Sequence, residues 1–344
     1  MTYPAFHAHT ASLVRKHLTP ERYQRLKNLK TPSGFALDDA ICSGLIHPDS
    51  SVGIYAGDKD SYTLFSDVFT PIIQDYHGLG QTLPRHVQKM TPQAFVPLDP
   101  EGRFIKSVRI RVARSLAGIP FSNHMTRAQR LEVETKAMDA AATLPPDLSG
   151  RYIRFSDLTQ AQLDALVADK LAFPKGDRFQ EAAGMNRDFP VGRGVFLSSD
   201  NCFRIWVNEE DHLRIMAVET GADFGQVLQG FVTGLAHMEA SLDLCFDPGI
   251  GFVNACPTNL GTAMRAGVHI HLPGLAKIKN QLKEIVSAHH LQIRGTMGEN
   301  TAVEEAVFDI SNARRLGVCA DTILADLHRG LDAIIQAEKN LTQH

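Results

Sequence analysis

The 344-residue sequence has few of the features that mark disulfide scaffolds, zinc centres or membrane spans. Its five cysteines are odd in number and scattered, without C-x-x-C spacing, which favours a reducing compartment. No apolar run approaches the about 18 residues that span a bilayer. Residues 1–18 lack the apolar core of a secretory signal. We therefore expect a cytoplasmic protein with no membrane partner.

A strong charge of either sign is absent as well. Lys and Arg number 35 against 38 Asp and Glu, so composition gives no reason to expect a nucleic-acid partner. The pattern G-x-x-x-x-G-K-[ST] does not occur, which excludes a P-loop nucleotide site. A dedicated carboxylate cage for a metal ion is not apparent either. What is present, 44% hydrophobic and 21% charged residues, is the composition of an ordinary globular protein long enough for two domains.

Helix and strand signals divide the chain into two parts. Residues 12–80 predict short helices, one of them with Thr19 as N-cap and Pro20 at the first helical position. Four prolines within residues 83–102 indicate a linker. Strands and helices then mix without regular βαβ alternation, which favours an antiparallel sheet. We expect an α+β protein, with a small all-helical N-terminal domain (1–90) and a larger C-terminal domain (91–344) whose antiparallel β-sheet is flanked by helices.

Within the second part, local patterns predict individual elements. Strands are expected at 105–112, 202–207, 213–218 and 268–272. Capping boxes at Thr126 and Thr159 each predict the start of a helix. Further helices are expected at 224–240, at 275–287 and at the end of the chain, where aliphatic residues recur along one face.

The most informative stretch is Cys-Pro-Thr-Asn-Leu-Gly-Thr at 256–262. A cysteine before proline is held in an extended or turn conformation. Gly261 lets the backbone approach another group closely, and Arg265 follows within reach of an anion. A buried thiol in a turn is the ordinary alternative. Two further runs, Asn-Glu-Glu-Asp-His-Leu-Arg at 208–214 and Arg-Gly-Thr-Met-Gly-Glu-Asn-Thr at 294–301, mix carboxylates and arginines in the same way.

Together these three runs resemble the ATP:guanidino phosphotransferases, or phosphagen kinases, over residues 13–341, and the arginine kinases most. The resemblance implies reversible transfer of the γ-phosphoryl group of ATP to the guanidino group of L-arginine, giving phosphoarginine and ADP. Mg²⁺ is then held through the nucleotide phosphates rather than by protein ligands. The expected partners are L-arginine and MgATP, and the protein is expected to be a monomer or a homodimer.

Arginines suit a triphosphate because their planar forks stay charged and grip phosphate oxygens bidentately. For any single arginine a surface ion pair is the ordinary alternative. The resemblance implies a nucleotide-phosphate clamp of five arginines: Arg109, Arg111, Arg214, Arg265 and Arg294. It also implies neighbouring nucleotide contacts from Ser107, Lys170, His269, Gly295, Thr296 and Gly298.

Carboxylates suit the guanidine, whose pKa above about 12 makes it a poor nucleophile until a base removes a proton. By resemblance, Glu210 and Glu299 flank the guanidinium, orient it and supply the base. Cys256 is expected to be a third negative contact, as a thiolate favoured by cationic surroundings. The neighbouring Glu209, Asp211 and His212 are expected to shape the turn or to form structural ion pairs.

A short loop in the first part resembles the guanidine-specificity loop of the family; it comprises Ser51, Val52, Gly53, Ile54 and Tyr55. A loop this short suits a long substrate such as arginine, with backbone groups and Tyr55 meeting its α-amino and carboxylate end. Glu299 also favours arginine as the substrate, since creatine kinases carry an aliphatic residue at this position. An ordinary turn with a buried tyrosine is the alternative.

Several positions depart from the usual arginine-kinase pattern: Val108 for threonine, Ala113 for glycine, Lys170 for histidine, and Met297 and Asn300 for arginine and histidine. Taurocyamine or another guanidino compound therefore stays open as the substrate. A protein-arginine kinase would lack the small helical domain. A rival of another class is a cysteine-nucleophile hydrolase acting on guanidines through Cys256, His212 and Glu210, in which five phosphate-seeking arginines would have no role.

Overall fold

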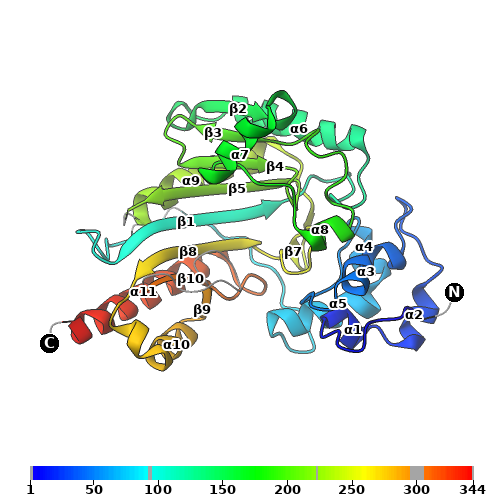
Figure 1. The fold of residues 1–344 in the computed structure, drawn as a ribbon, viewed down its shortest axis with the longest axis horizontal. Coiled ribbons are helices and arrows are strands. Elements are labelled where there is room, and N and C mark those ends of the chain that lie inside the picture. The colour runs from blue at the N-terminus through cyan, green and yellow to red at the C-terminus, as the bar shows by residue number, and fades with distance from the viewer. Residues whose placement is uncertain (1–2, 92–94, 222–223, 295–305, 343–344) are drawn as a thin grey trace.

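The computed structural model describes residues 3–91, 95–221, 224–294 and 306–342. It consists of a bundle of short helices followed by a large antiparallel sheet with helices on its faces, which confirms the expected α+β class (Figure 1). None of the helices in these ranges is both long enough and apolar enough to cross a membrane.

The N-terminal bundle contains α1 (Leu13–His17), α2 (Pro20–Leu26), α3 (Leu37–Ile46), α4 (Asp60–Leu64) and α5 (Ser66–His77). The predicted cap of α2 is confirmed, because the Thr19 side chain accepts the Arg22 N–H at 3.3 Å. Fully buried Phe35, Phe65 and Phe69 centre the bundle core. Side chains from the second part, Ala255 among them, join the same cluster. The bundle is therefore packed firmly against the larger domain.

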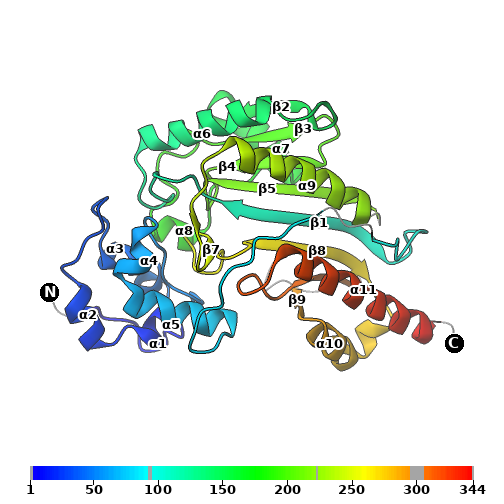
Figure 2. The same cartoon turned by 180° about the vertical axis from the view of Figure 1, so that it is seen from behind.

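Between α5 and β1 (Ile105–Arg114), the described residues of 78–104 form no helix or strand. Figure 2 shows this linker crossing from the bundle toward the start of β1, between α9 (Phe224–Ser241) and α11 (Ala320–Thr342). We propose residue 90, within this segment, as the boundary between the domains.

Eight strands form the large sheet in the order β2-β3-β4-β5-β1-β8-β10-β9, and every neighbouring pair is antiparallel. Beside β1, its strands are β2 (Gly150–Arg154), β3 (Gly194–Ser198), β4 (Phe203–Val207), β5 (Leu213–Thr220), β8 (Met264–His271), β9 (Leu291–Arg294) and β10 (Val307–Asn312). A separate two-stranded sheet pairs β6 (Phe246–Asp247) with β7 (Gly251–Phe252).

The two faces of the large sheet have different surroundings. Helices α6 (Arg127–Ala142), α9 and α11 lie across the rear face (Figure 2). Side chains alternate along a strand, so Val108, Ile110 and Val112 of β1 are buried beneath these helices. Their neighbours Arg109 and Arg111 lie on the front face, as predicted. The remaining helices are α7 (Gln160–Ala168), α8 (Arg178–Ala182), α10 (Lys279–Ala288) and the 3₁₀ turns Pro146–Leu148, Phe155–Asp157 and Leu275–Lys277.

Local predictions in this domain hold where the sequence contains a helix cap or a clear hydrophobic periodicity. Both capping boxes, at Thr126 and Thr159, are confirmed. Strand β8 starts at Met264, before the expected residue 268, so that Arg265 lies on a strand rather than in a loop. The helix expected at 275–287 is divided at Ile278 into a 3₁₀ turn and α10. Strands β2, β3, β6, β7, β9 and β10 were not predicted.

Candidate active site

Strand register places the expected phosphate-binding side chains on adjacent strands at the centre of the front face. Arg111 of β1 lies opposite Arg265 of β8 on one side and Met216 of β5 on the other. In the next row of the same face, two residues away along each strand, Arg109 pairs with Gly267 and Val218. A Cβ at Gly267 would lie 2.6 Å from the Ile310 carbonyl oxygen, so the glycine lets β10 pack closely beside β8. Two cationic rows therefore form because the three strands are antiparallel and in register.

A third row continues outward from these two. Ser107 pairs with His269 of β8, and His269 pairs with Asp309 of β10. Asp309 in turn pairs with Arg294, at the end of β9. The row therefore joins three predicted nucleotide contacts and one acidic residue that the sequence analysis did not single out.

A pocket lies over these rows and extends to a wall formed by β4 and the segment after α7. Apart from Arg294, the strand residues just described line it, together with Val167, Asp169, Lys170, Ala172, Pro174, Arg204, Trp206 and Thr220. Arg204 donates to the Lys170 carbonyl at 2.8 Å, and Trp206 Nε1 donates to the Leu171 carbonyl at 2.9 Å. The wall is therefore fixed to the sheet. Its mixture of apolar side chains and an indole ring suits a planar base, whereas the arginine rows suit phosphates.

The arginine rows concentrate positive charge on the floor of the pocket. Desolvation, followed by the charges of Arg265 and Arg214, lowers the pKa of Arg109 to about 10. Burial also lowers the pKa of Arg111, again with help from neighbouring arginines. Asp309 lies 2.5 Å from the Arg265 guanidinium and balances part of this charge. An anion that entered the pocket would relieve the remaining repulsion.

The clamp continues toward the signature run through a smaller pocket lined by Arg111, Arg214, Arg265, Asn259 and Arg315, among others. Arg315 was missed in the sequence analysis. It is 7% exposed, and its NH1 donates to the Thr258 carbonyl at 3.0 Å and to Asn259 Oδ1 at 3.1 Å. Arg315 thus ties the signature run to the clamp. Its position in Asn-Ala-Arg-Arg-Leu-Gly, just after β10, was the available signal.

The signature run forms a tight turn in which the Asn259 N–H donates to the Cys256 carbonyl at 2.9 Å. Cys256 Sγ lies 3.1 Å from Thr258 Oγ1. Gly261 has a φ of +75°, and a Cβ there would lie 2.6 Å from the Arg315 carbonyl oxygen. The expected close backbone approach at this glycine is confirmed.

Glu209 and Glu210 both bind Arg214, whose guanidinium is held between them. Glu209 makes a two-point contact, at 2.8 Å to Nε and 3.0 Å to NH1, while Glu210 binds NH2. Burial raises the pKa of Glu210, and Arg214 opposes that shift. For Glu209 the expected structural ion pair is confirmed. Glu210 combines a raised pKa with direct contact to an arginine of the clamp.

The next two residues hold the turn in place. Asp211 accepts the Asn259 side-chain amide at 3.0 Å, which joins the 208–214 run to the signature. Burial, followed by the charge of Glu210, raises the Asp211 pKa to about 8. His212 accepts the Leu116 N–H at Nδ1 (3.0 Å), and its Nε2 donates to the Pro120 carbonyl at 2.9 Å. Burial lowers the His212 pKa to about 4. With both ring nitrogens bound to backbone, His212 cannot serve as the base for Cys256.

The protonation expected for Cys256 requires correction. The thiol is 6% exposed, and burial followed by the charge of Glu210 raises its pKa to about 12. Cationic surroundings therefore do not stabilise a thiolate here, because burial and then the charge of Glu210 both favour the neutral thiol. A cation placed between Cys256 and Glu210 would reverse the shift, since an opposite charge favours the ionised form.

The proposed specificity loop from the N-terminal domain lies directly against this turn. The Ala56 N–H donates to the Ala255 carbonyl at 2.8 Å, and the Tyr62 hydroxyl donates to the Asn254 carbonyl at 2.7 Å. Burial raises the pKa of Tyr55, and the next largest contributions come from Cys256 and Glu210.

A second connection between the domains lies at the edge of the site. Asp49 forms an ion pair with Arg178 at the start of α8. His47 Nε2 lies 3.0 Å from the Arg178 carbonyl, and its ring packs edge-on against Phe179. The loop that carries Tyr55 is thus anchored at both ends to the larger domain.

Four expected site residues, Gly295, Thr296, Gly298 and Glu299, lie outside the described residues, as do Met297 and Asn300. In the described part of the chain, no three His, Cys, Asp or Glu side chains gather in a way that could hold a metal ion.

Comparison with protein families gives the geometry a context. The family model for the C-terminal catalytic domain of ATP:guanido phosphotransferases matches residues 132–341, and the model for their N-terminal domain matches residues 8–74. The chain belongs to this family. Phosphagen kinases use MgATP, so the pocket over the arginine rows belongs to a nucleotide-dependent phosphotransferase.

Individual relatives of this phosphagen kinase are similar over nearly its whole length. It is 42% identical to an arginine kinase from Limulus polyphemus over 95% of this chain and 92% of that protein. It is 40% identical to the arginine kinase Lit v 2 from Penaeus vannamei over 96% and 93%. An arginine kinase from Anthopleura japonica is 42% identical over 95% of this chain, which spans only 46% of that protein.

Two solved structures have the same fold. A lombricine kinase superposes with a TM-score of 0.93 at 33% identity, covering 99% of this chain and 95% of that one. The duplicated taurocyamine kinase from Schistosoma mansoni, with transition-state-analogue components bound, gives 0.91 at 30% identity and covers 98% and 47%. The relatives are thus named for three different guanidino substrates.

Proposed function

We propose that this phosphagen kinase is a cytoplasmic arginine kinase, which transfers the γ-phosphoryl group of MgATP reversibly to L-arginine. The observation that carries the proposal is the backbone hydrogen bond from Ala56 to Ala255. It holds the short loop 51–55 against the signature turn, so that Tyr55 can meet the far end of an arginine whose guanidinium lies between Cys256 and Glu210.

The nucleotide is proposed to lie across the front face. Its base occupies the wall near Lys170 and Trp206, with Ser107 and His269 beside the ribose. The phosphates run along the arginine rows toward Arg214, with Arg294 at the outer edge. Gly295, Thr296 and Gly298 remain proposed contacts. Mg²⁺ fits as an ion held by phosphate oxygens and water, because the described residues offer it no carboxylate cage. When bound, it neutralises charge on the phosphates.

Catalysis then depends mainly on position and electrostatics. Glu210 is fixed by Arg214 beside the clamp, so it can orient the guanidinium with one nitrogen in line with the γ-phosphorus. Its raised pKa makes it a better proton acceptor than an ordinary glutamate. The guanidinium charge in turn favours the ionised forms of Glu210 and Cys256. Glu299 is proposed as the second flanking carboxylate.

Taurocyamine or another guanidino compound is the second candidate substrate, since relatives named for lombricine and taurocyamine share the fold. The hydrolase alternative loses support because His212 is neutral and engaged with backbone at both nitrogens. Either a monomer or a homodimer is compatible with this function.

A coupled assay of ADP release tests the proposal with arginine, taurocyamine, lombricine and creatine as separate substrates. ADP release that depends on arginine, with the highest kcat/KM of the four, is the expected result. A higher kcat/KM for taurocyamine or lombricine would reassign the substrate. Ammonia release from a guanidine without ATP would replace the kinase with a hydrolase.

A further inference from the structure

The proposed specificity loop, residues 51–55, is held between two parts of the protein. On one side it is bonded to α3: the Gly44 N–H donates to the Gly53 carbonyl at 3.1 Å, and the Tyr55 N–H donates to the Ala40 carbonyl at 3.0 Å. On the other side, the residue that follows the loop donates to the signature turn of the larger domain. A shift of the loop away from α3 is therefore a shift toward the signature turn.

Two glycines face each other where the loop meets α3. A Cβ on Gly44 would lie 2.5 Å from the Gly53 carbonyl oxygen and 2.9 Å from its Cα. A Cβ on Gly53 would lie 3.0 Å from the Gly44 Cα. Val14 of α1 closes the contact from the side, because its Cγ1 would lie 2.8 Å from a Cβ on either glycine. Carbon atoms in contact are ordinarily about 3.5 Å apart or more, so the helix and the loop approach this closely only because both side chains are absent.

The two glycines are required for different reasons. Gly53 has a φ of +74°, a conformation that other residues rarely adopt. Gly44 lies within α3, where the backbone suits any residue and alanine would favour the helix more than glycine does. Its own backbone therefore does not call for glycine. The space that the loop occupies explains its presence.

We propose that Gly44 is a positioning residue that determines substrate specificity: its missing side chain sets how far the loop stands from the signature turn, and thereby the length of guanidine that the site accepts. The inference rests on the proposed function of the loop. In Gly44→Ala the loop has to move off α3 by roughly 1 Å, because the atoms in the way belong to its backbone and the surrounding core is closely packed. The space between the loop and the signature turn then becomes shorter. Arginine loses more from this change than taurocyamine, which is the shorter molecule.

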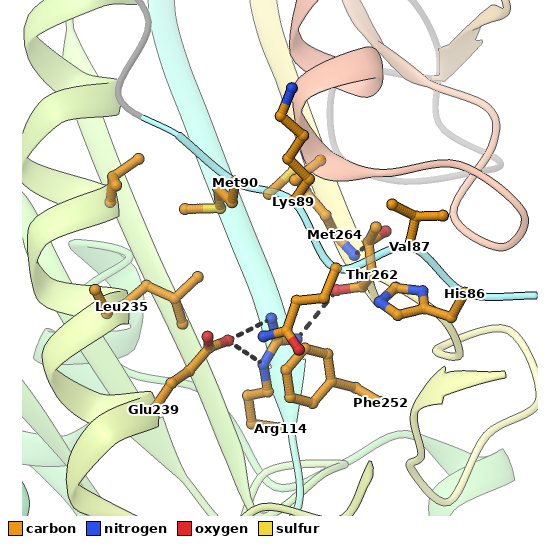
Figure 3. A pocket seen from close by; sticks show the side chains of 14 residues that line it. His86, Val87, Lys89, Met90, Arg114, Leu235, Glu239, Phe252, Thr262 and Met264 are labelled. Atoms are coloured by element: carbon orange, nitrogen blue, oxygen red, sulfur yellow. Dashed lines mark hydrogen bonds and ion pairs between the residues drawn. The ribbon is translucent and has the colours of Figure 1, made fainter. Parts of the chain in front are cut away.

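Two further glycine-to-alanine changes separate this effect from a general loss of stability. Gly230 and Gly234 both lie on α9, the helix that carries Leu235 beside β1 in Figure 3, on the rear side of the sheet. A Cβ at Gly234 would lie 2.4 Å from the Phe203 ring, so Gly234→Ala strains the fold away from the loop. No described atom outside the helix lies within 4 Å of a Cβ at Gly230, so Gly230→Ala adds the same methyl group without strain.

Steady-state kinetics with arginine and with taurocyamine test the proposal, with thermal melts to report stability. The wild type is expected to have the higher kcat/KM for arginine. Gly44→Ala should lower the ratio of the two kcat/KM values about tenfold, mainly through a higher KM for arginine, and should leave the KM for MgATP within about twofold. Gly230→Ala and Gly234→Ala should keep the wild-type ratio, whatever their melting temperatures. Should Gly44→Ala fail to fold, Val14→Ala with and without Gly44→Ala gives the same comparison in a background with more room.

An unchanged ratio in Gly44→Ala, or an equal fall in Gly234→Ala, would overturn the role of Gly44. A proportional loss of kcat with both substrates would also overturn it, since that result would show general damage to the site. A wild type that does not phosphorylate arginine would instead overturn the proposed function. The two failures are therefore distinguished by the wild-type measurement alone.

Discussion

Replacing Glu210 with glutamine separates the chemistry of the site from its architecture. Glutamine keeps the shape of the side chain but removes its charge and its basicity. Arg214 keeps the two-point contact with Glu209, so its buried charge stays compensated. Burial raises the pKa of Glu210, which means that the fold disfavours its ionised form. A neutral isostere should therefore leave the melting temperature within a few degrees of the wild type.

Turnover should respond very differently. The variant loses a charge-assisted hydrogen bond to the guanidinium and the proposed proton acceptor. Together these are worth roughly 3–4 kcal/mol of transition-state stabilisation, or about a hundredfold to a thousandfold in rate. Wild-type activity should also fall in acid at a higher pH than an ordinary glutamate would cause, and the variant should lack that fall. Cys256→Ser should be less damaging, because a hydroxyl can still bond the guanidine.

Glu209→Gln is the matched control, since Glu209 binds the same arginine but is not proposed to face the substrate. Coupled ADP release at saturating MgATP and arginine, with circular-dichroism melts, compares the two variants. We expect Glu209→Gln to keep turnover within about tenfold of the wild type. Equal losses in both variants would show that the glutamates act only by holding Arg214. Near-normal turnover of Glu210→Gln would pass the role of base to Glu299.

Three further outcomes are expected. Arg265→Ala should cut turnover about a hundredfold or more, roughly 3 kcal/mol, because it leaves Asp309 uncompensated beside the phosphates; the same assay on Arg204→Ala, whose guanidinium bonds backbone carbonyls, should show a smaller loss. The raised pKa of Asp211, about 8 in the folded state, contributes stability that is complete below about pH 4 and is lost as the pH rises through 8. Urea unfolding should therefore show the stability of Asp211→Asn rising relative to that of the wild type over this pH range. The opposite trend would contradict the raised pKa. Small-angle scattering should show compaction when MgADP, arginine and nitrate are added together, and an unchanged radius of gyration would refute domain closure.

Local signals account for the parts of the fold that could be predicted. The caps at Thr19, Thr126 and Thr159 act within one helical turn, so they are visible in a short window of sequence. Strand β3 has no such signal: all five of its residues are buried, because side chains pack on both faces, and no alternation remains to be seen. The helix at 275–287 was placed by its apolar period, which does not report the break at Ile278.

The residues of the candidate site also divide into those that local sequence signals predict and those that depend on tertiary contacts. The arginines of β1 were placed on one face by the period of a strand alone. That Arg265 lies opposite Arg111 depends on the register between β1 and β8, which arises from pairing between distant segments. Arg315 and Asp309 were missed because their roles come from tertiary contacts with the signature turn and with Arg265. The Cys256 pKa was misjudged because burial depth cannot be read from neighbours in sequence.

The register of the central strands also limits how chain length can vary in this enzyme. Inserting one residue just before Val108 in β1, with the preceding residues kept in register, would turn Arg109 toward the helices of the rear face and bring Val108 and Ile110 to the front. A single event would then remove both the anion site and part of the core. Tolerated insertions and deletions should therefore be confined to connections such as those between β1 and α6 or between α7 and α8. In a library of random single-residue insertions selected for folded protein, no insertion should be recovered within the central strands.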